Sequence, residues 1–228
     1  MHEIFLKMVN STNTYAKENI ESVTIPCLIT ADEQTAGRGR RGNMFFSPKD
    51  TGLYMTVVFP APDNCELLTP AAAVAVCHVL EKHDIQPQIK WVNDIFVNGC
   101  KVCGILTERF LSGQNSYIAL GVGINLTTES FPENLTAAGS INLECDKTSL
   151  AREIAQQILK YVEKPDDESV ISQYRKFLFI IGRDINYSKN NIEYSAVVND
   201  INAQCNLIVT RADGTEDILS SGEISIKI

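Results

Sequence analysis

The sequence lacks a long hydrophobic run, and its basic residues are fewer than its acidic ones. No apolar stretch in the 228 residues approaches the ~20 that a membrane helix needs, and residues 1–10 lack the apolar core of a secretory signal. We therefore expect a cytoplasmic protein with no membrane partner. Twenty Lys and Arg stand against 28 Asp and Glu, giving a net charge of −8. Because duplex binding depends on cationic side chains that neutralise phosphates, we expect no nucleic-acid partner.

The seven cysteines also lack the pattern of a metal site. They are odd in number and scattered, and the one C-x-x-C, Cys100 to Cys103, has no second pair near it. A lone pair is a weak zinc signal, since structural zinc takes four ligands. We expect thiols in a reducing compartment that act as small apolar side chains, and no metal held by the protein alone.

The order of apolar runs and chain breakers predicts an α+β main domain followed by a small all-β unit. Strands are expected over 26–31, 52–59, 88–91 and 117–124, and helices from about residue 14 and over 67–83, 150–162 and 169–179. Asn98-Gly99 lies between the apolar runs 95–97 and 102–106, as is typical of a two-residue hairpin. From Gly182 the runs shorten and alternate, which predicts a small β-barrel. We divide the chain into domains at 1–181 and 182–228.

A run rich in glycine and arginine extends from Gln34 to Gly42. It holds three arginines within four residues and three glycines: Arg38, Arg40, Arg41, Gly37, Gly39 and Gly42. Glycine lets the backbone turn tightly and present its N–H groups, and arginine supplies fixed charge with paired donors for phosphate or carboxylate. The combination indicates a flexible loop that closes over an anion. A solvated basic turn and a nucleic-acid contact are the alternatives.

Two further blocks place charge and glycine at strand ends. The first is Lys90 to Asp94 (KWVND), followed across the hairpin by Lys101; lysine suits a phosphate, and a carboxylate can help hold Mg²⁺ or orient an amine. The second is Gly121 to Asn125 (GVGIN), whose two glycines lie on one strand face and allow close approach. Solvated lysines in a turn, and a packing point in a strand, are the structural alternatives.

Taken together and in this order, the blocks resemble the catalytic domain of biotin–protein ligases. The matching blocks are STN (11–13), QTAGRGRRG (34–42), KWVND (90–94), KVCGIL (101–106), GVGIN (121–125) and GEIS (222–225). The resemblance spans about residues 1–228. Phe45 stands where many members have tryptophan, and STN begins too early for the N-terminal DNA-binding domain of bifunctional relatives. We therefore expect the monofunctional form.

The resemblance implies a fold and a reaction. The fold would be a mixed sheet flanked by helices, related to lipoate ligases, followed by a small SH3-like barrel. Biotin and ATP, with Mg²⁺, would form biotinyl-5′-AMP, and biotin would pass to a lysine of a biotin carboxyl carrier protein. A lipoate–protein ligase of the same fold and a non-catalytic anion-binding module are the alternatives. A homodimer through sheet edges is left open.

The resemblance also assigns roles to residues. The catalytic residues would be Lys101, Arg40 and Asp94, with Asp94 beside the incoming lysine. Biotin would be bound by the STN block, the loop and the strand glycines: Ser11, Thr12, Asn13, Gln34, Gly37, Arg38, Arg40, Lys101, Gly121 and Gly123. ATP would be bound by the loop and the nucleotide side: Arg38, Arg40, Arg41, Gly42, Phe45, Lys90, Trp91, Asn93 and Asn125.

Overall fold

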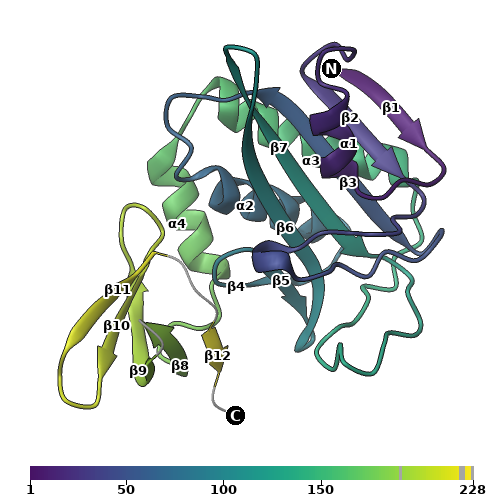
Figure 1. The fold of residues 1–228 in the computed structure, drawn as a ribbon. Helices are drawn as coiled ribbons and strands as arrows, with labels where there is room; N and C mark the ends of the chain where they lie inside the picture. The colour runs from purple at the N-terminus through teal and green to yellow at the C-terminus, as the bar shows by residue number, and fades with distance from the viewer. Residues whose placement is uncertain (190–191, 221–223, 227–228) are drawn as a thin grey trace.

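The computed structural model describes residues 1–189, 192–220 and 224–226. Within them, seven strands form one mixed sheet in the order β1-β2-β3-β7-β6-β5-β4 (Figure 1). The strands are β1 (His2–Leu6), β2 (Cys27–Ala31), β3 (Gly52–Pro60), β4 (Gln88–Lys90), β5 (Asp94–Val97), β6 (Cys100–Ser112) and β7 (Asn115–Asn125). The edge strand β1 runs parallel to β2, and the other neighbours are antiparallel.

Four described helices cover the two faces of this sheet: α1 (Thr12–Glu18), α2 (Leu68–Glu81), α3 (Lys147–Glu163) and α4 (Asp167–Phe177). Successive side chains of β7 point to opposite faces of the sheet. Leu120, Val122 and Ile124 join the main core beneath α2 and α3, whereas Ala119 joins a smaller core beneath α1. Figure 1 shows α1 on one face of the sheet, with α2 and α3 on the other. The face shared with α1 is the one that carries the candidate site.

Local signals place most of these elements. The Asn98-Gly99 turn has the positive φ angles expected of it, 51° and 78°, and joins β5 to β6. Helices α3 and α4 begin a few residues earlier than expected, because the side chains of Asp146 and Asp166 accept hydrogen bonds from the first-turn amides of Thr148 and Ser169.

Five described strands after residue 183 form a second, antiparallel sheet in the order β11-β10-β9-β8-β12. They are β8 (Asp184–Lys189), β9 (Ile192–Ile201), β10 (Leu207–Arg211), β11 (Glu216–Leu219) and β12 (Ile224–Ile226). The antiparallel sheet is confirmed, whereas its closure into an SH3-like barrel stays a prediction, as does the domain boundary at residue 182. Gly222 and Glu223 of the GEIS block lie outside the described residues.

One strand of the large sheet, β1, was not expected from the sequence. Its five residues are mostly exposed and carry no clear apolar alternation. It forms by adding to the edge of β2, with Ile4 opposite Ile29. None of the described helices has the length and apolar character needed to cross a membrane.

Candidate active site

A pocket opens on the α1 face of the large sheet. Its walls come from segments far apart in the sequence: the start of α1, residues 38–45, residues 90–94, strands β6 and β7, and Ile224 of β12. Lys101 lies on β6, where its N–H donates to Ala137 O (2.7 Å) and its carbonyl accepts from Gly139 N (2.9 Å). The segment 137–139 thus pairs with the strand at Lys101 and holds its backbone at the pocket wall.

Residues 37–45, expected to form a flexible loop, fold into a narrow hairpin. Phe45 N donates to Gly37 O (2.9 Å), and Gly39 N donates to Asn43 O (2.7 Å). The tip turns through a short 3₁₀ segment, Arg40–Gly42, in which Arg41 and Gly42 have φ angles of 55° and 81°. Such angles suit glycine and strain most other residues. The hairpin carries its arginines as a preformed group across the pocket.

The end of the pocket nearest α1 is polar and internally hydrogen-bonded. Gln34 Oε1 accepts from Thr12 N (2.9 Å), and Gln34 Nε2 donates to Ser47 Oγ (2.9 Å). The hydroxyl of Thr56 donates to Asn13 Oδ1 (2.6 Å) from the neighbouring strand. Ser11, Thr12 and Asn13 are each only 3% exposed. The hydrogen bonds fix the orientation of these buried side chains before any ligand binds. This end is therefore preorganised for a neutral polar group of a ligand.

The two glycines of β7 form part of the pocket floor, where side chains approach too closely for a larger residue. A Cβ at Gly121 would lie 2.4 Å from Asn13 Oδ1, and one at Gly123 would lie 2.5 Å from the Phe45 ring. The close approach expected from GVGIN is therefore present. In this structure the side chains that approach the two glycines are those of Asn13 and Phe45.

The opposite end of the pocket is cationic. The described lining residues of the whole pocket include five basic side chains, Arg38, Arg40, Arg41, Lys90 and Lys101, against one carboxylate, Asp94. Of the five, Arg38 pairs with Glu108, which also binds Asn13 at the polar end. Lys101 Nζ lies 2.8 Å from Asp94 Oδ1, and Arg40 Nη1 donates to Asn93 Oδ1 (3.2 Å). In a chain of net charge −8, so local an excess of positive charge favours an anionic ligand.

The C-terminal segments hold the 90–94 wall in place. Trp91 Nε1 donates to Cys205 O (2.8 Å), and the hydroxyl of Tyr174 donates to Val92 O (2.9 Å). Both donors are buried, and burial raises the pKa of the Tyr174 hydroxyl well above its usual value. These contacts tie the second sheet and α4 to the backbone that carries Asn93 and Asp94.

The structure brings most of the predicted site residues together. All of them line the pocket except three, Gly37, Gly42 and Asn125. Gly37 is buried under its own hairpin, where a Cβ would meet Phe45 O at 2.3 Å, and Gly42 serves the turn. Asn125 donates to Gly139 O (2.9 Å), and among the described residues nothing pairs with its buried Oδ1.

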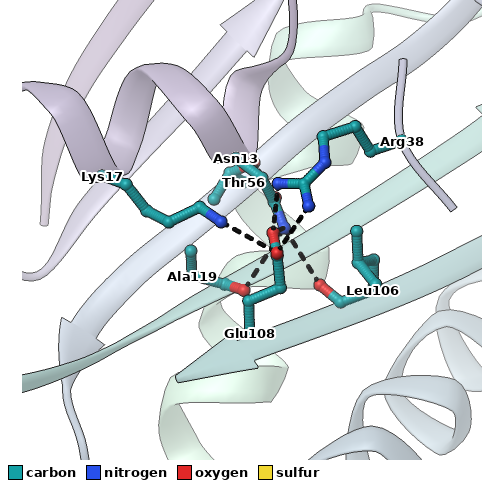
Figure 2. A network of polar contacts seen from close by, with 7 residues as sticks. All are labelled: Asn13, Lys17, Arg38, Thr56, Leu106, Glu108 and Ala119. Atoms are coloured by element: carbon teal, nitrogen blue, oxygen red, sulfur yellow. Dashed lines mark hydrogen bonds and ion pairs between the residues drawn. The ribbon is translucent and has the colours of Figure 1, made fainter. Parts of the chain in front are cut away.

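Sequence reasoning missed Glu108, which gathers several pocket residues around one carboxylate (Figure 2). Its partners are Lys17, Arg38 and Asn13. Burial raises the pKa of the Glu108 carboxyl, but the hydrogen bonds and charges of its partners together hold it below the usual value. Glu108 lies on the same face of β6 as Gly104 and Leu106, because side chains alternate along a strand. A carboxylate two residues after the KVCGIL block was therefore the sequence signal that could have identified it.

Cys100 and Cys103 lie on β6, as expected for two thiols on a strand. Cys100 is exposed and Cys103 is buried, and both are free. Burial raises the pKa of the Cys103 thiol far above its usual value, which disfavours the reactive thiolate. The geometry gives no support to redox chemistry at this pair.

Comparisons with known proteins agree on one family. The sequence profile described as "Biotin/lipoate A/B protein ligase family" matches residues 5–125. The chain is 27% identical to the bifunctional ligase/repressor BirA of Escherichia coli over 235 residues, covering 97% of this chain and 73% of BirA. It is 33% identical to the biotin–[acetyl-CoA-carboxylase] ligase of Paracoccus denitrificans over 131 residues, covering 53% of each.

Solved structures show the same fold. The biotin protein ligase from Aquifex aeolicus, solved with biotin and ATP, superposes with a TM-score of 0.82 at 24% identity, covering 99% of this chain and 98% of that one. The biotin protein ligase from Leishmania major, solved with biotinyl-5-AMP, gives a TM-score of 0.65 at 25% identity, covering 96% and 99%.

Proposed function

Because the chain belongs to the biotin/lipoate A/B protein ligase family, we propose that it is an ATP-dependent biotin–protein ligase that works through a biotinyl-adenylate. The Paracoccus relative is named a biotin–[acetyl-CoA-carboxylase] ligase, and the two similar structures described above are biotin protein ligases, one with biotin and ATP and one with biotinyl-5-AMP. The finer proposal concerns which groups of this chain bind, orient and transfer.

One observation carries the proposal: a single pocket joins a hydrogen-bonded polar end to a cationic end. Biotin has a neutral ureido group at one end and a carboxylate at the other, so it can span the two. The ureido group would lie near Thr12 and Gln34, and the carboxylate near Lys101. The ATP phosphates would then share the cationic end with the carboxylate, as adenylation requires.

In the first step, an oxygen of the biotin carboxylate attacks the α-phosphorus of ATP. The bond from that phosphorus to the bridging oxygen breaks, and pyrophosphate leaves. Carboxylate and triphosphate repel each other, so the reaction needs positive charge where both meet. Arg38, Arg40 and Lys101 would supply it and stabilise the charge that builds on phosphorus. The proposal requires no protein nucleophile.

In the second step, the ε-amine of a carrier lysine attacks the carbonyl of the mixed anhydride, and AMP leaves. Asp94 would orient the incoming amine, while its 2.8 Å contact with Lys101 keeps that lysine in place. The name of the Paracoccus relative suggests the carrier subunit of a carboxylase as the acceptor. The hairpin would cover the adenylate between steps and keep water from it.

Mg²⁺ belongs to the proposal as the companion of ATP. It usually keeps several waters and binds one or two carboxylates with the substrate phosphates, and Asp94 supplies a carboxylate at the cationic end. Bound there, it would neutralise phosphate charge. The protein's own contribution remains the placement of Arg38, Arg40 and Lys101.

Exchange of pyrophosphate into ATP tests the proposal. The purified chain is incubated with ATP and labelled pyrophosphate, and with biotin, with lipoate, or with neither. Biotin-dependent exchange supports the proposed function. Exchange with lipoate alone would replace it with lipoate ligation, and no exchange with either would leave an anion-binding module.

A further inference from the structure

Glu108 is the meeting point of two walls of the pocket. Its carboxylate lies on β6 with 19% of the side chain exposed. From the hairpin, Arg38 Nη1 and Nη2 lie 3.1 and 3.0 Å from its two oxygens. From α1, Asn13 Nδ2 donates to Oε2 (2.9 Å) and Lys17 Nζ to Oε1 (2.8 Å). Figure 2 shows the side chains converging on the carboxylate.

The carboxylate fixes which way the Asn13 amide points. A carboxylate only accepts hydrogen bonds, so the NH₂ end of Asn13 must face it. That end also lies 3.3 Å from the carbonyl of Leu106. The amide oxygen then faces the hydroxyl of Thr56 at 2.6 Å, and this hydroxyl lies 2.8 Å from that of Thr12. The orientation set by Glu108 thus reaches the hydroxyl of Thr12, which lines the pocket.

The same carboxylate holds the base of the arginine hairpin. Arg38 pairs with Met44 across the hairpin, one step from the Gly37–Phe45 end. A two-pronged guanidinium–carboxylate contact is directional as well as strong, so it limits tilting of the hairpin over the pocket. The tip is held separately, through Arg40 and Asn93.

We infer that Glu108 is a positioning residue of the site: it fixes Asn13 and Arg38, and through them the polar end of the pocket and the hairpin over it. Glu108 does not itself line the pocket, whereas Asn13 and Arg38 both do. This role in ligand binding rests on the proposed function. The anchoring of the hairpin does not, and it can be tested without any substrate.

The first experiment measures how firmly the hairpin is held. The whole protein is digested with a limiting amount of trypsin in the absence of ligand, and the rate of cleavage after Arg38, Arg40 and Arg41 is measured by mass spectrometry. Glu108→Gln should be cleaved there at least about fivefold faster than the parent. Two controls are matched. Lys17→Gln removes a partner but leaves Arg38 attached, and Glu3→Gln breaks a similar two-pronged pair with Arg152 (2.7 and 2.8 Å) away from the pocket. Both should keep the parent rate.

The second experiment compares KM values in the exchange reaction. Glu108→Gln should raise the KM for biotin about tenfold, the effect of losing one charge-assisted contact. The KM for ATP should rise less than that for biotin, because Arg40 and Lys101 keep their contacts with Asn93 and Asp94 when Arg38 is released. A residue that only stabilises the fold would lower the melting temperature and leave both KM values unchanged. Glu108→Asp, which keeps the charge but shortens the reach, should fall between Glu108→Gln and the parent in both experiments.

The outcomes separate the two proposals. A parent without biotin-dependent exchange would overturn the proposed function, while the trypsin rates still decide whether Glu108 anchors the hairpin. A parent with exchange, but with equal cleavage and equal KM values in Glu108→Gln, would overturn the role of Glu108. If Glu108→Gln does not fold, Glu108→Asp replaces it, and parental values in that variant would count against the role in the same way.

Discussion

Two carboxylates, one in each sheet, collect nearly the same set of partners. Glu108 receives a lysine, an arginine and the neutral donor Asn13. Asp217 of β11 receives a lysine, an arginine and a neutral donor as well: Lys189, Arg211 and the hydroxyl of Tyr187. Chemical composition therefore does not distinguish the two clusters.

The clusters differ in what they join. The partners of Asp217 all come from the small sheet, and Arg211 also lies over the Tyr194 ring at 3.8 Å from its centroid. The partners of Glu108 come from α1 and the hairpin, two segments outside the sheet that carries Glu108. We therefore expect the Asp217 cluster, which lies inside one sheet, to contribute mainly to stability, and the Glu108 cluster, which joins separate walls of the pocket, to contribute to binding. The variants below test this contrast through activity and stability measured side by side.

The largest effect on activity is expected from Lys101→Ala. Lys101 faces the cationic end of the pocket and is paired with Asp94, so its loss removes charge where the proposed phosphorus attack occurs. We expect adenylate formation to fall roughly 100- to 1000-fold with little change in melting temperature. The matched control is Lys82→Ala, which removes the lysine of an exposed pair with Glu153 and should matter little. Near-parental exchange in folded Lys101→Ala would remove Lys101 from the reaction centre.

A smaller effect is expected from Arg40→Gly, which removes the contact that holds the hairpin tip to Asn93. In the proposed complex Arg40 also contributes a charge-assisted bond to the anionic adenylate, worth roughly 1.5–3 kcal/mol, so its loss should shorten adenylate retention about ten- to a hundredfold. Glycine also increases the entropy lost when the hairpin orders. The rate at which labelled adenylate is released, measured by rapid gel filtration, should therefore change more than the rate of its synthesis. Arg109→Ala, at an exposed arginine of β6, is the control; equal retention in Arg40→Gly and the parent would contradict a covering role for the hairpin.

Local sequence signals predicted most of the fold. The Asn98-Gly99 turn, the apolar runs of β3 and β7 and the apolar helix α2 are encoded by neighbouring residues, and the structure confirms them. Strand β1 was missed because its formation depends on pairing with β2, more than twenty residues further along the chain. Its own residues carry little strand signal, so tertiary contact decides its structure.

The sequence blocks also predicted which residues would meet in the pocket, but not how they are held. The partners of Glu108 are 70, 91 and 95 residues away in the sequence. Only the register of β6 against β7, with Gly104 opposite Gly123, places Glu108 beneath α1 and the hairpin. A pairing register of this kind is not encoded locally. For the same reason the hairpin was read as a flexible loop, since its cross-strand hydrogen bonds appear only in the structure.

The smallest effect on activity, with a clear effect on stability, is expected from Asp217→Asn. Hydrogen bonds from Lys189 and Tyr187, with the charge of Arg211, lower the pKa of Asp217 to about 2. The unfolded chain has an ordinary Asp pKa of about 3.9, so it binds the proton more tightly than the folded protein does. The stabilisation is therefore fully present above about pH 4 and is lost as the pH falls towards 2.

At neutral pH we expect Asp217→Asn to lower the free energy of unfolding by on the order of 2 kcal/mol, or roughly 4–8 °C in melting temperature. Its biotin-dependent exchange should stay within about twofold of the parent, because Asp217, Lys189, Arg211 and Tyr187 do not line the pocket. The link between the cluster and the pocket wall is the strand pairing of Tyr187 with Ile224, and the substitution leaves that backbone pairing in place. The control is Asp200→Asn, which breaks the exposed pair between Asp200 of β9 and Arg175 of α4 and should cost less than half as much. The stability difference between Asp217→Asn and the parent should shrink between about pH 4 and pH 2. A large loss of exchange in folded Asp217→Asn would show that the small sheet's cluster also shapes the pocket, and the contrast with Glu108 would fail.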